Sequence, residues 1–424
     1  MGTKSKWLRL AALTGALALV LVACGDDGEG GGDGTETGGA PETITVLHDI
    51  GGEEEQAALQ AALDAFEAAT GHTVQPELTD DIATTLNIRV DGNNPPDVVL
   101  HPQPGALAAF AAEGALTPLA DVGVTDFDGL VPGMVETGTF DGTIYGVVVK
   151  AAVSSLLWYR TDLVDTAPTT WDDLVALSGE LADGGTTPWC IGIESGGATG
   201  WVTTNWIEDI VLGNEGGDGY DQWTSNELTF SSPEITAAFE QAAEIFFDED
   251  FVVGGTTGIV NTPFGDAAVP MWQDPPGCAL HRQAGFIEGS FTGEFGTDYN
   301  VALNPATNGG AVFSGNVAAV MTDSQAAGQL VEFLISAEGQ EAWHSHAGSG
   351  SLSVRADFDT SLYPSASLSG QGELLAGASV ARFDGSDLMP SAVGGNEFFS
   401  QLVAWLNGQD LATTLADIDA AWPA

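Results

Sequence analysis

The stretch that decides the fold is Tyr145-Gly-Val-Val-Val-Lys-Ala-Ala-Val-Ser-Ser-Leu-Leu-Trp-Tyr159. It reads as one extended, mainly apolar run, which is too long for a single ordinary strand of about five or six residues. A run of this kind in the middle of a chain is typical of a segment that passes from one lobe to another. We therefore expect two lobes that are joined by crossing strands.

The residues before this run alternate between strand-like and helix-like patterns. In the second predicted element, Leu59, Leu63 and Phe66 recur at helical spacing and Gly71 ends the helix. This βαβα order predicts an α/β fold with a mainly parallel sheet that is covered by helices. Strands are predicted over residues 43–47, 73–78 and 97–100, and helices over residues 53–70, 82–91 and 105–113.

The residues after the run continue the alternation, and the length of 424 residues suits two large lobes. Ser232-Pro233-Glu234 predicts a helix start, because proline is favoured in the first turn. The pattern predicts a strand over 189–193, one helical segment over 324–346, and terminal helices over 396–406 and 411–421.

The first 23 residues are predicted to be a lipoprotein signal peptide. Basic residues precede an apolar segment over residues 11–23, which is shorter than the roughly 20 residues that a membrane-spanning helix needs. Leu21-Val22-Ala23-Cys24 then resembles a lipobox, in which the cysteine accepts a lipid. The alternative is an ordinary signal peptide with a chance cysteine. Residues 24–41 are rich in Gly and acids, which predicts a flexible tether.

The charge balance excludes whole classes of partner. Nine Lys and Arg face 60 Asp and Glu, for a net charge of −51. Nucleic-acid binding is excluded because phosphates need a basic surface, and docking on an anionic membrane surface is excluded for the same reason. The 44% hydrophobic content indicates a globular protein. So acidic a chain suits an external and saline setting, where salt screens the repulsion.

The motifs of common enzyme classes are absent from the sequence. It contains no GxSxG, no P-loop, no HExxH and no CxxC pair. His344 and His346 lack a third clustered ligand and are expected to be surface residues. What remains is a set of aromatic and hydrogen-bonding residues near predicted strand ends, a combination that suits sugar binding.

Several long stretches resemble one family, the family-1 extracellular solute-binding proteins of ABC importers, and among them the alpha-glucoside-binding lipoproteins. The residues that carry the resemblance are GNNPPDVVLHPQPG (92–105), YGVVVKAAVSSLLWY (145–159), PTTWDDLVALS (168–178), TPWCIGIESGGATGWVTTNWIEDIVL (187–212), TPFGDAAVP (262–270), CALHRQAGFI (278–287) and RFDGSDLMPSAVGG (382–395).

The resemblance implies a periplasmic-binding-protein-like fold, in which two α/β lobes close on a sugar. Lobe 1 would comprise residues 42–152 and 316–347, and lobe 2 residues 153–315 and 348–424. The protein would be a monomer without cofactor or metal, held by its lipid at the outer face of the cytoplasmic membrane. It would pass an alpha-glucoside or oligosaccharide to a permease.

The resemblance also places the ligand contacts and a disulfide. A disulfide would join Cys190 and Cys278, for which two free thiols are the alternative. Phe399 would supply a stacking face where relatives of the maltose-binding type carry an aromatic. The implied ligand contacts are Asp49, His101, Gln103, Lys150, Glu194, Trp201, Arg282 and Phe399.

Six of these eight residues also have a structural alternative. Lys150 could form an ion pair, and Arg282 could form a salt bridge inside one lobe. His101 and Trp201 could lie in the core. For Glu194, a ligand contact and a structural role are equally open. Phe398 would then fill the core beside Phe399.

Two segments depart from the family pattern. Residues 49–54 read DIGGEE where relatives often carry an aromatic, and Met271-Trp272-Gln273 replaces an aliphatic stretch. Two other functions stay open at this point: a secreted carbohydrate-active enzyme, and a binding protein for a non-sugar solute such as a polyamine.

Overall fold

The computed structural model describes residues 40–79 and 81–423. Within it, Pro41–Ala424 form one compact unit. The predicted signal peptide, the lipid site at Cys24 and the tether up to residue 39 lie outside the described residues. No helix in the described part of the chain combines the length and the apolar character that crossing a bilayer requires.

The first sheet contains the predicted βαβα unit. β1 (Thr43–His48) pairs in parallel with both β2 (Thr73–Leu78) and β3 (Val98–His101), as the sequence predicts. The sheet order is β12-β11-β3-β1-β2, and β6 also pairs with β11. We call the part around this sheet the first lobe. Its other strands and its helices are β6 (Gly146–Val153), β11 (Ala311–Val320), β12 (Ala381–Phe383), α1 (Glu53–Thr70), α2 (Ile82–Asp91), α3 (Pro104–Ala112), α8 (Gln325–Ile335) and α9 (Ala337–His344).

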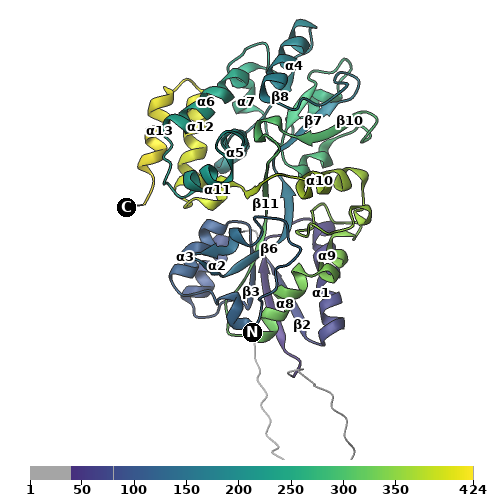
Figure 1. Ribbon diagram of the computed structural model, residues 1–424, viewed down its shortest axis with the longest axis vertical. Coiled ribbons are helices and arrows are strands. Elements are labelled where there is room, and N and C mark those ends of the chain that lie inside the picture. The colour runs from purple at the N-terminus through teal and green to yellow at the C-terminus, as the bar shows by residue number, and fades with distance from the viewer. Residues whose placement is uncertain (1–39, 80, 424) are drawn as a thin grey trace, which may run out of the picture. The chain divides into compact units, whose positions relative to one another are not determined.

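The second sheet has the order β10-β7-β9-β8, and we call the part around it the second lobe. Figure 1 shows the two lobes at opposite ends of the crossing strands β6 and β11. The α/β fold is therefore confirmed. The elements of the second lobe are β7 (Leu156–Arg160), β8 (Trp189–Cys190), β9 (Leu280–Arg282), β10 (Tyr299–Leu303), α4 (Trp171–Asp183), α5 (Trp201–Thr224), α6 (Pro233–Phe246), α7 (Gly255–Asn261), α10 (Ala366–Ala376), α11 (Gly385–Leu388), α12 (Phe399–Leu406) and α13 (Leu411–Ala420). A short hairpin joins β4 (Thr139–Phe140) and β5 (Thr143–Ile144) before β6.

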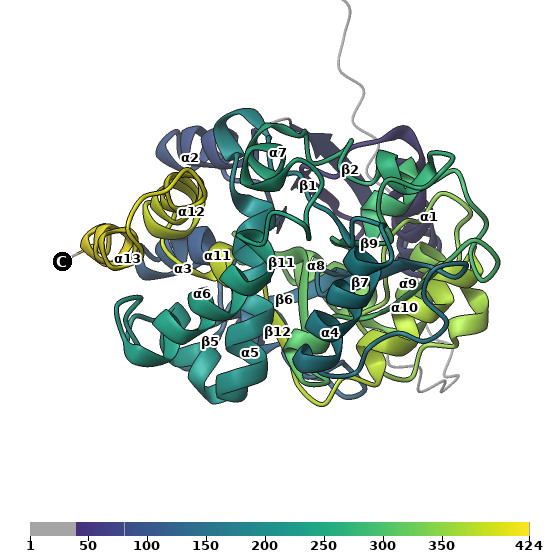
Figure 2. The same cartoon turned by 90° about the horizontal axis from the view of Figure 1, so that it is seen from above.

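The long extended run is two strands that belong to different sheets. It breaks at Ser154 and Ser155, whose backbone N–H groups both donate to the carbonyl of Val312 in β11, at 2.8 and 3.3 Å. The hydroxyl of Ser155 also donates to Asp209 at 2.5 Å. These contacts anchor the switch from β6 to β7. Seen from above, β6 and β11 lie near the middle of the molecule, as Figure 2 shows.

Strand register shows which ends of the two sheets face each other. His101, at the carboxyl end of β3, lies opposite Val317. The residues of β11 that precede Val317 extend from there toward the second sheet. Arg282, at the carboxyl end of β9, lies opposite Leu157, near the start of β7. Because β1 is parallel to β3 and β8 to β9, all four carboxyl ends face the crossing. Ligands of open α/β sheets bind beyond such ends.

Two segments differ from the sequence predictions. The helical segment over 324–346 is two helices, because Ser336 ends α8 and its side chain caps α9 by accepting from Gly339 N at 3.1 Å. The segment after α9 was assigned to lobe 2, yet Leu352 exchanges backbone hydrogen bonds with Ala151 in β6, and Val354 accepts one from Val131. Residues 349–356 therefore lie against the first lobe.

A disulfide joins Cys190, at the end of β8, to Cys278, which precedes β9. The two strands are parallel neighbours, and the Cα atoms lie 5.7 Å apart. The pairing is the one that the resemblance implies.

Candidate functional site

A polar group lies at the carboxyl ends of β1 and β3. Asp49 directly follows β1, and the side-chain amide of Asn316 in β11 donates to its carboxylate at 3.1 Å. Gln103, which precedes α3, donates from its side-chain amide to Asp387 of α11 at 3.4 Å. Burial raises the pKa of Asp49, while the bond from Asn316 lowers it. We call these four residues the polar group, and it contains side chains from both lobes.

Lys150 lies in β6 next to this polar group, with its ammonium 3.3 Å from Glu55 in α1. The other oxygen of Glu55 accepts from the backbone N–H of Gly350 at 2.5 Å. The lysine charge also acts on Asp49, whose pKa it lowers slightly. In this structure Lys150 therefore forms an ion pair beside the polar group, as its structural alternative predicts.

His101 and Arg282 are buried and do not reach the surface of the site. His101 is 0% exposed; its Nδ1 accepts from the backbone N–H of Gln103 at 3.0 Å, and Nε2 has no partner. Burial lowers the pKa of His101 to about 4. Arg282 donates from Nε to Asp209 at 2.8 Å and from a terminal nitrogen to the carbonyl of Asn205 at 2.9 Å. The prediction of direct ligand contact by these two residues is corrected: both support the site from within their lobes.

An aromatic group lies at the carboxyl ends of β8 and β9. Trp201, the first residue of α5, is 5.4 Å from Phe264 and 6.0 Å from Phe286 between ring centroids. Phe286 is 52% exposed and Trp201 is half-buried. Glu194 adjoins them, because its backbone carbonyl accepts from Phe264 N at 3.1 Å. The structure thus presents an open aromatic surface with a carboxylate beside it.

Phe399 lies next to this aromatic group. Its backbone packs so tightly on Gly200 that a Cβ there would lie 2.5 Å from the Phe399 carbonyl oxygen. Phe399 is half-buried, whereas Phe398 is fully buried and packs on Trp223 and Phe230 in the core. Phe398 therefore fills the core, and Phe399 remains a candidate for ligand contact.

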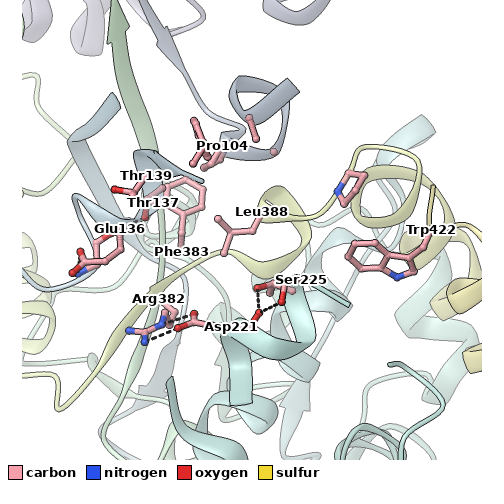
Figure 3. Close-up of a pocket in the computed structure, with 16 residues that line it drawn as sticks. Pro104, Glu136, Thr137, Thr139, Asp221, Ser225, Arg382, Phe383, Leu388 and Trp422 are labelled. Carbon is pink, nitrogen blue, oxygen red and sulfur yellow. Dashed lines mark hydrogen bonds and ion pairs between the residues drawn. The ribbon is translucent and has the colours of Figure 1, made fainter. Parts of the chain in front are cut away.

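A cavity of about 480 Å³ lies beside the contact between α3 and α11, and both lobes line it. Figure 3 shows Leu388 among apolar side chains and Asp221 paired with Arg382. The Thr224 and Ser225 hydroxyls already donate to backbone carbonyls. None of the predicted site residues lines this cavity. The polar and aromatic groups therefore remain the candidate ligand site, and they lie outside this cavity.

Four members of these groups were missed from the sequence: Asn316, Asp387, Phe264 and Phe286. Each of the last three lies within a stretch that carries the family resemblance, which was the available signal. The expectation that His344 is a surface residue was wrong, because it is fully buried and faces the hydroxyls of Ser349 and Ser351. Among the described residues, no group of three His, Cys, Asp or Glu side chains is placed to hold a metal ion.

Comparison with known proteins shows the family and the fold. The family profile described as bacterial extracellular solute-binding protein matches residues 51–341. The osmoprotective compounds-binding protein of Synechocystis sp. is 36% identical, with 99% of this chain and 100% of that relative covered. The alpha-glucosides-binding periplasmic protein of Rhizobium meliloti is 33% identical, covering 90% of this chain and 87% of its own length.

Solved structures show the same fold at low sequence identity. A bacterial solute receptor with a preference for β-D-galactopyranose has a TM-score of 0.74 at 15% identity and covers 90% of this chain and 97% of its own. The cyclic alpha-maltosyl-1,6-maltose binding protein from Arthrobacter globiformis has a TM-score of 0.68 at 18% identity, with 90% and 98% covered.

Proposed function

The chain belongs to the bacterial extracellular solute-binding protein family, and we propose that its ligand is an alpha-glucoside or a related osmoprotective sugar. Like its relatives, it is a solute-binding protein of an ABC transporter and not an enzyme. It acts outside the cytoplasm. The carbohydrate-active enzyme considered from the sequence is therefore set aside. The identity of the ligand, its delivery to a permease and the lipid anchor are parts of the proposal.

The observation that carries the proposal is the pairing of a polar group with an aromatic group at strand ends that face each other. A sugar presents hydroxyls, which need carboxylate and amide partners such as Asp49 and Gln103. It also presents apolar C–H faces, which stack on rings such as Trp201 and Phe286. Contacts to both lobes would stabilise the closed arrangement, because a ligand shifts a conformational equilibrium by its differential affinity for the two states.

A thermal-shift screen with maltose, trehalose and sucrose tests the ligand class. A ligand at about 100 times its Kd stabilises the folded state by about 2.7 kcal/mol, so a bound sugar raises the Tm measurably. Calorimetry then gives the affinity for each sugar that raises the Tm. If none of the three sugars changes the Tm at millimolar concentration, the alpha-glucoside proposal fails.

A polyamine is the second candidate, and one observation favours it. The carboxyl groups of Asp49 and Asp387 come from different lobes and act electrostatically on each other. Two acids in this position would suit a cation. Spermidine belongs in the same screen, and a Tm increase with spermidine alone would replace the sugar proposal.

The lipid anchor on Cys24 has its own test. Cys24→Ala would remove the only lipidation site that the sequence predicts. We expect the variant to be found in the medium or as uncleaved precursor, while the wild-type protein stays with the membrane fraction. Equal membrane association of both proteins would contradict the anchor.

A further inference from the structure

A row of four carboxyl groups begins in the core of the second lobe. Glu208 in α5 is 0% exposed and Asp384, before α11, is 7% exposed. The side-chain amide of Asn205 bridges them, donating to Glu208 at 3.3 Å and to Asp384 at 2.7 Å. Ser386 adds a hydroxyl bond to Asp384 at 2.7 Å and a backbone N–H bond to Glu208 at 3.4 Å. The two carboxyl groups thus share one hydrogen-bonded network.

The row continues across the lobe boundary. Asp387 follows in α11 and accepts from Gln103 of the first lobe at 3.4 Å. Asp49, held by Asn316, is the fourth member, and its charge acts on Asp387. The lobes touch closely here, since a Cβ at Gly105 in α3 would lie 2.5 Å from the carbonyl oxygen of Met389.

In the described part of the chain, no Lys or Arg forms a salt bridge with a carboxyl group of the row. The charge of Arg282 acts on Glu208 and that of Lys150 acts on Asp49, but Arg282 is paired with Asp209 and Lys150 with Glu55. Every basic residue in the described part of the chain is engaged with a carboxylate outside the row. These ion pairs are Arg89–Glu77, Lys150–Glu55, Arg160–Asp162, Arg282–Asp209, Arg355–Asp357 and Arg382–Asp221.

Buried carboxylates without a cation keep protons. Removing an ionised carboxylate from water is costly, and a second carboxylate nearby adds repulsion. Burial first, and then Asp384, raises the pKa of Glu208 and that of Asp387 well above the usual range. Tyr220 also faces the network, and its hydroxyl is neutral because burial raises its pKa. The raised pKa values favour the protonated, neutral form of Glu208 and Asp387.

We propose that the contact between the two lobes is proton-linked: Asp387, within the row Glu208–Asp384–Asp387–Asp49, takes up a proton when α11 meets α3. Separating the lobes would hydrate Asp387 and move it away from Asp49. Both changes favour its ionised form, so an open protein releases protons and a closed protein binds them. Lowering the pH accordingly favours the closed arrangement. This inference does not depend on which solute the protein binds.

Small-angle scattering of the ligand-free protein tests the inference directly. We expect a smaller radius of gyration at about pH 5.5 than at about pH 8.5 in the wild type. Asp387→Asn should lose that difference, because its side chain cannot ionise. Asp172→Asn, a matched change at an exposed position in the first turn of α4, should keep it. A radius that is independent of pH in the wild type, or equally dependent in all three proteins, overturns the proposal.

Further measurements check that the variants fold and count the protons directly. Circular dichroism and Tm establish that Asp387→Asn is folded, and Glu208→Gln provides a second variant of the row in the core. Calorimetry with trehalose in two buffers of different ionisation enthalpy then counts protons taken up on binding. If trehalose binds without proton uptake, the proton linkage is wrong although the proposed function holds. If no sugar binds, the proposed function fails and scattering alone decides the linkage.

Discussion

The side-chain amide of Gln103 donates a hydrogen bond to Asp387 at 3.4 Å, across 284 residues of sequence and across the boundary between the two lobes. At Gly105, in the first turn of α3, an added Cβ would lie 2.5 Å from the carbonyl oxygen of Met389 and 2.9 Å from that of Leu388. The first turn of α3 and the end of α11 therefore form a lobe-to-lobe contact at the edge of the candidate ligand site. Any change that separates them should also change ligand capture.

Gly105→Ala is expected to weaken ligand binding. The new Cβ would lie 2.5 Å from the Met389 oxygen, closer than real contacts allow, so α3 and α11 must move apart. We expect roughly a tenfold increase in the Kd for a bound sugar, or about 1.4 kcal/mol. Calorimetry measures this. Gly179→Ala in α4 is the control, because a Cβ there meets nothing within 4 Å and should not alter the Kd.

Phe399→Ala is expected to cost roughly 1–3 kcal/mol of sugar affinity, through lost stacking and lost apolar burial. Its ring is half-buried beside the aromatic group, whereas Phe398 serves the core. Phe247→Ala is the matched control, since Phe247 is 41% exposed and packs on Trp405 away from the site. An unchanged titration curve for Phe399→Ala would remove this residue from the site.

Arg282→Met is expected to affect stability far more than affinity. Asp209 would remain buried at 0% side-chain exposure without its cation, and breaking such a pair typically costs about 3–5 kcal/mol. Urea unfolding measures the loss. The double variant Arg282→Met with Asp209→Asn should recover part of it. If instead the Kd rises while the unfolding curve is unchanged, Arg282 contacts the ligand after all.

Local patterns predicted the first lobe well, because its elements depend on near neighbours. Leu59, Leu63 and Phe66 lie on the buried face of α1, as their spacing predicts. The length of the crossing run predicted more than one strand, but the exact position of the break was not predictable, because it depends on bonds from Ser154 and Ser155 to residues far along the chain.

Tertiary contacts likewise decided which candidate residues reach the site. Asp387 resembled every other acid in a chain that carries 60 of them, and only the fold places it beside Gln103. Arg282 was equally suited to a ligand and to a salt bridge until the position of Asp209 was known. The family resemblance therefore indicated the region of the candidate site, while the partner of each side chain required the structure.

A thiol count on the denatured, non-reduced protein should find no free thiol at Cys190 or Cys278, because the two residues form a disulfide. The cysteines are 88 residues apart, and the chain-entropy model assigns such a loop about 4–5 kcal/mol of stabilisation. We therefore expect reduction to lower the Tm clearly. Two reactive thiols before reduction would contradict the bridge.

His101 should make stability and ligand capture sensitive to acid. Burial lowers its pKa to about 4, from an ordinary value of 6.5, so the folded state holds the neutral ring. A group with a lowered pKa contributes stability above pH 6.5 that is lost as the pH falls toward 4, here about 3 kcal/mol in total. Protonation of Nδ1 also removes the acceptor for the Gln103 backbone N–H. Acid should therefore loosen the loop that carries Gln103.

His101→Gln is the test, with unfolding by urea measured between about pH 7 and about pH 4. The wild type should lose more stability over this range than the variant. The raised pKa values of Glu208 and Asp387 act in the opposite direction, but they are common to both proteins, so the difference between the two curves isolates the effect of His101. Parallel curves for wild type and His101→Gln would show that the buried ring does not titrate with folding.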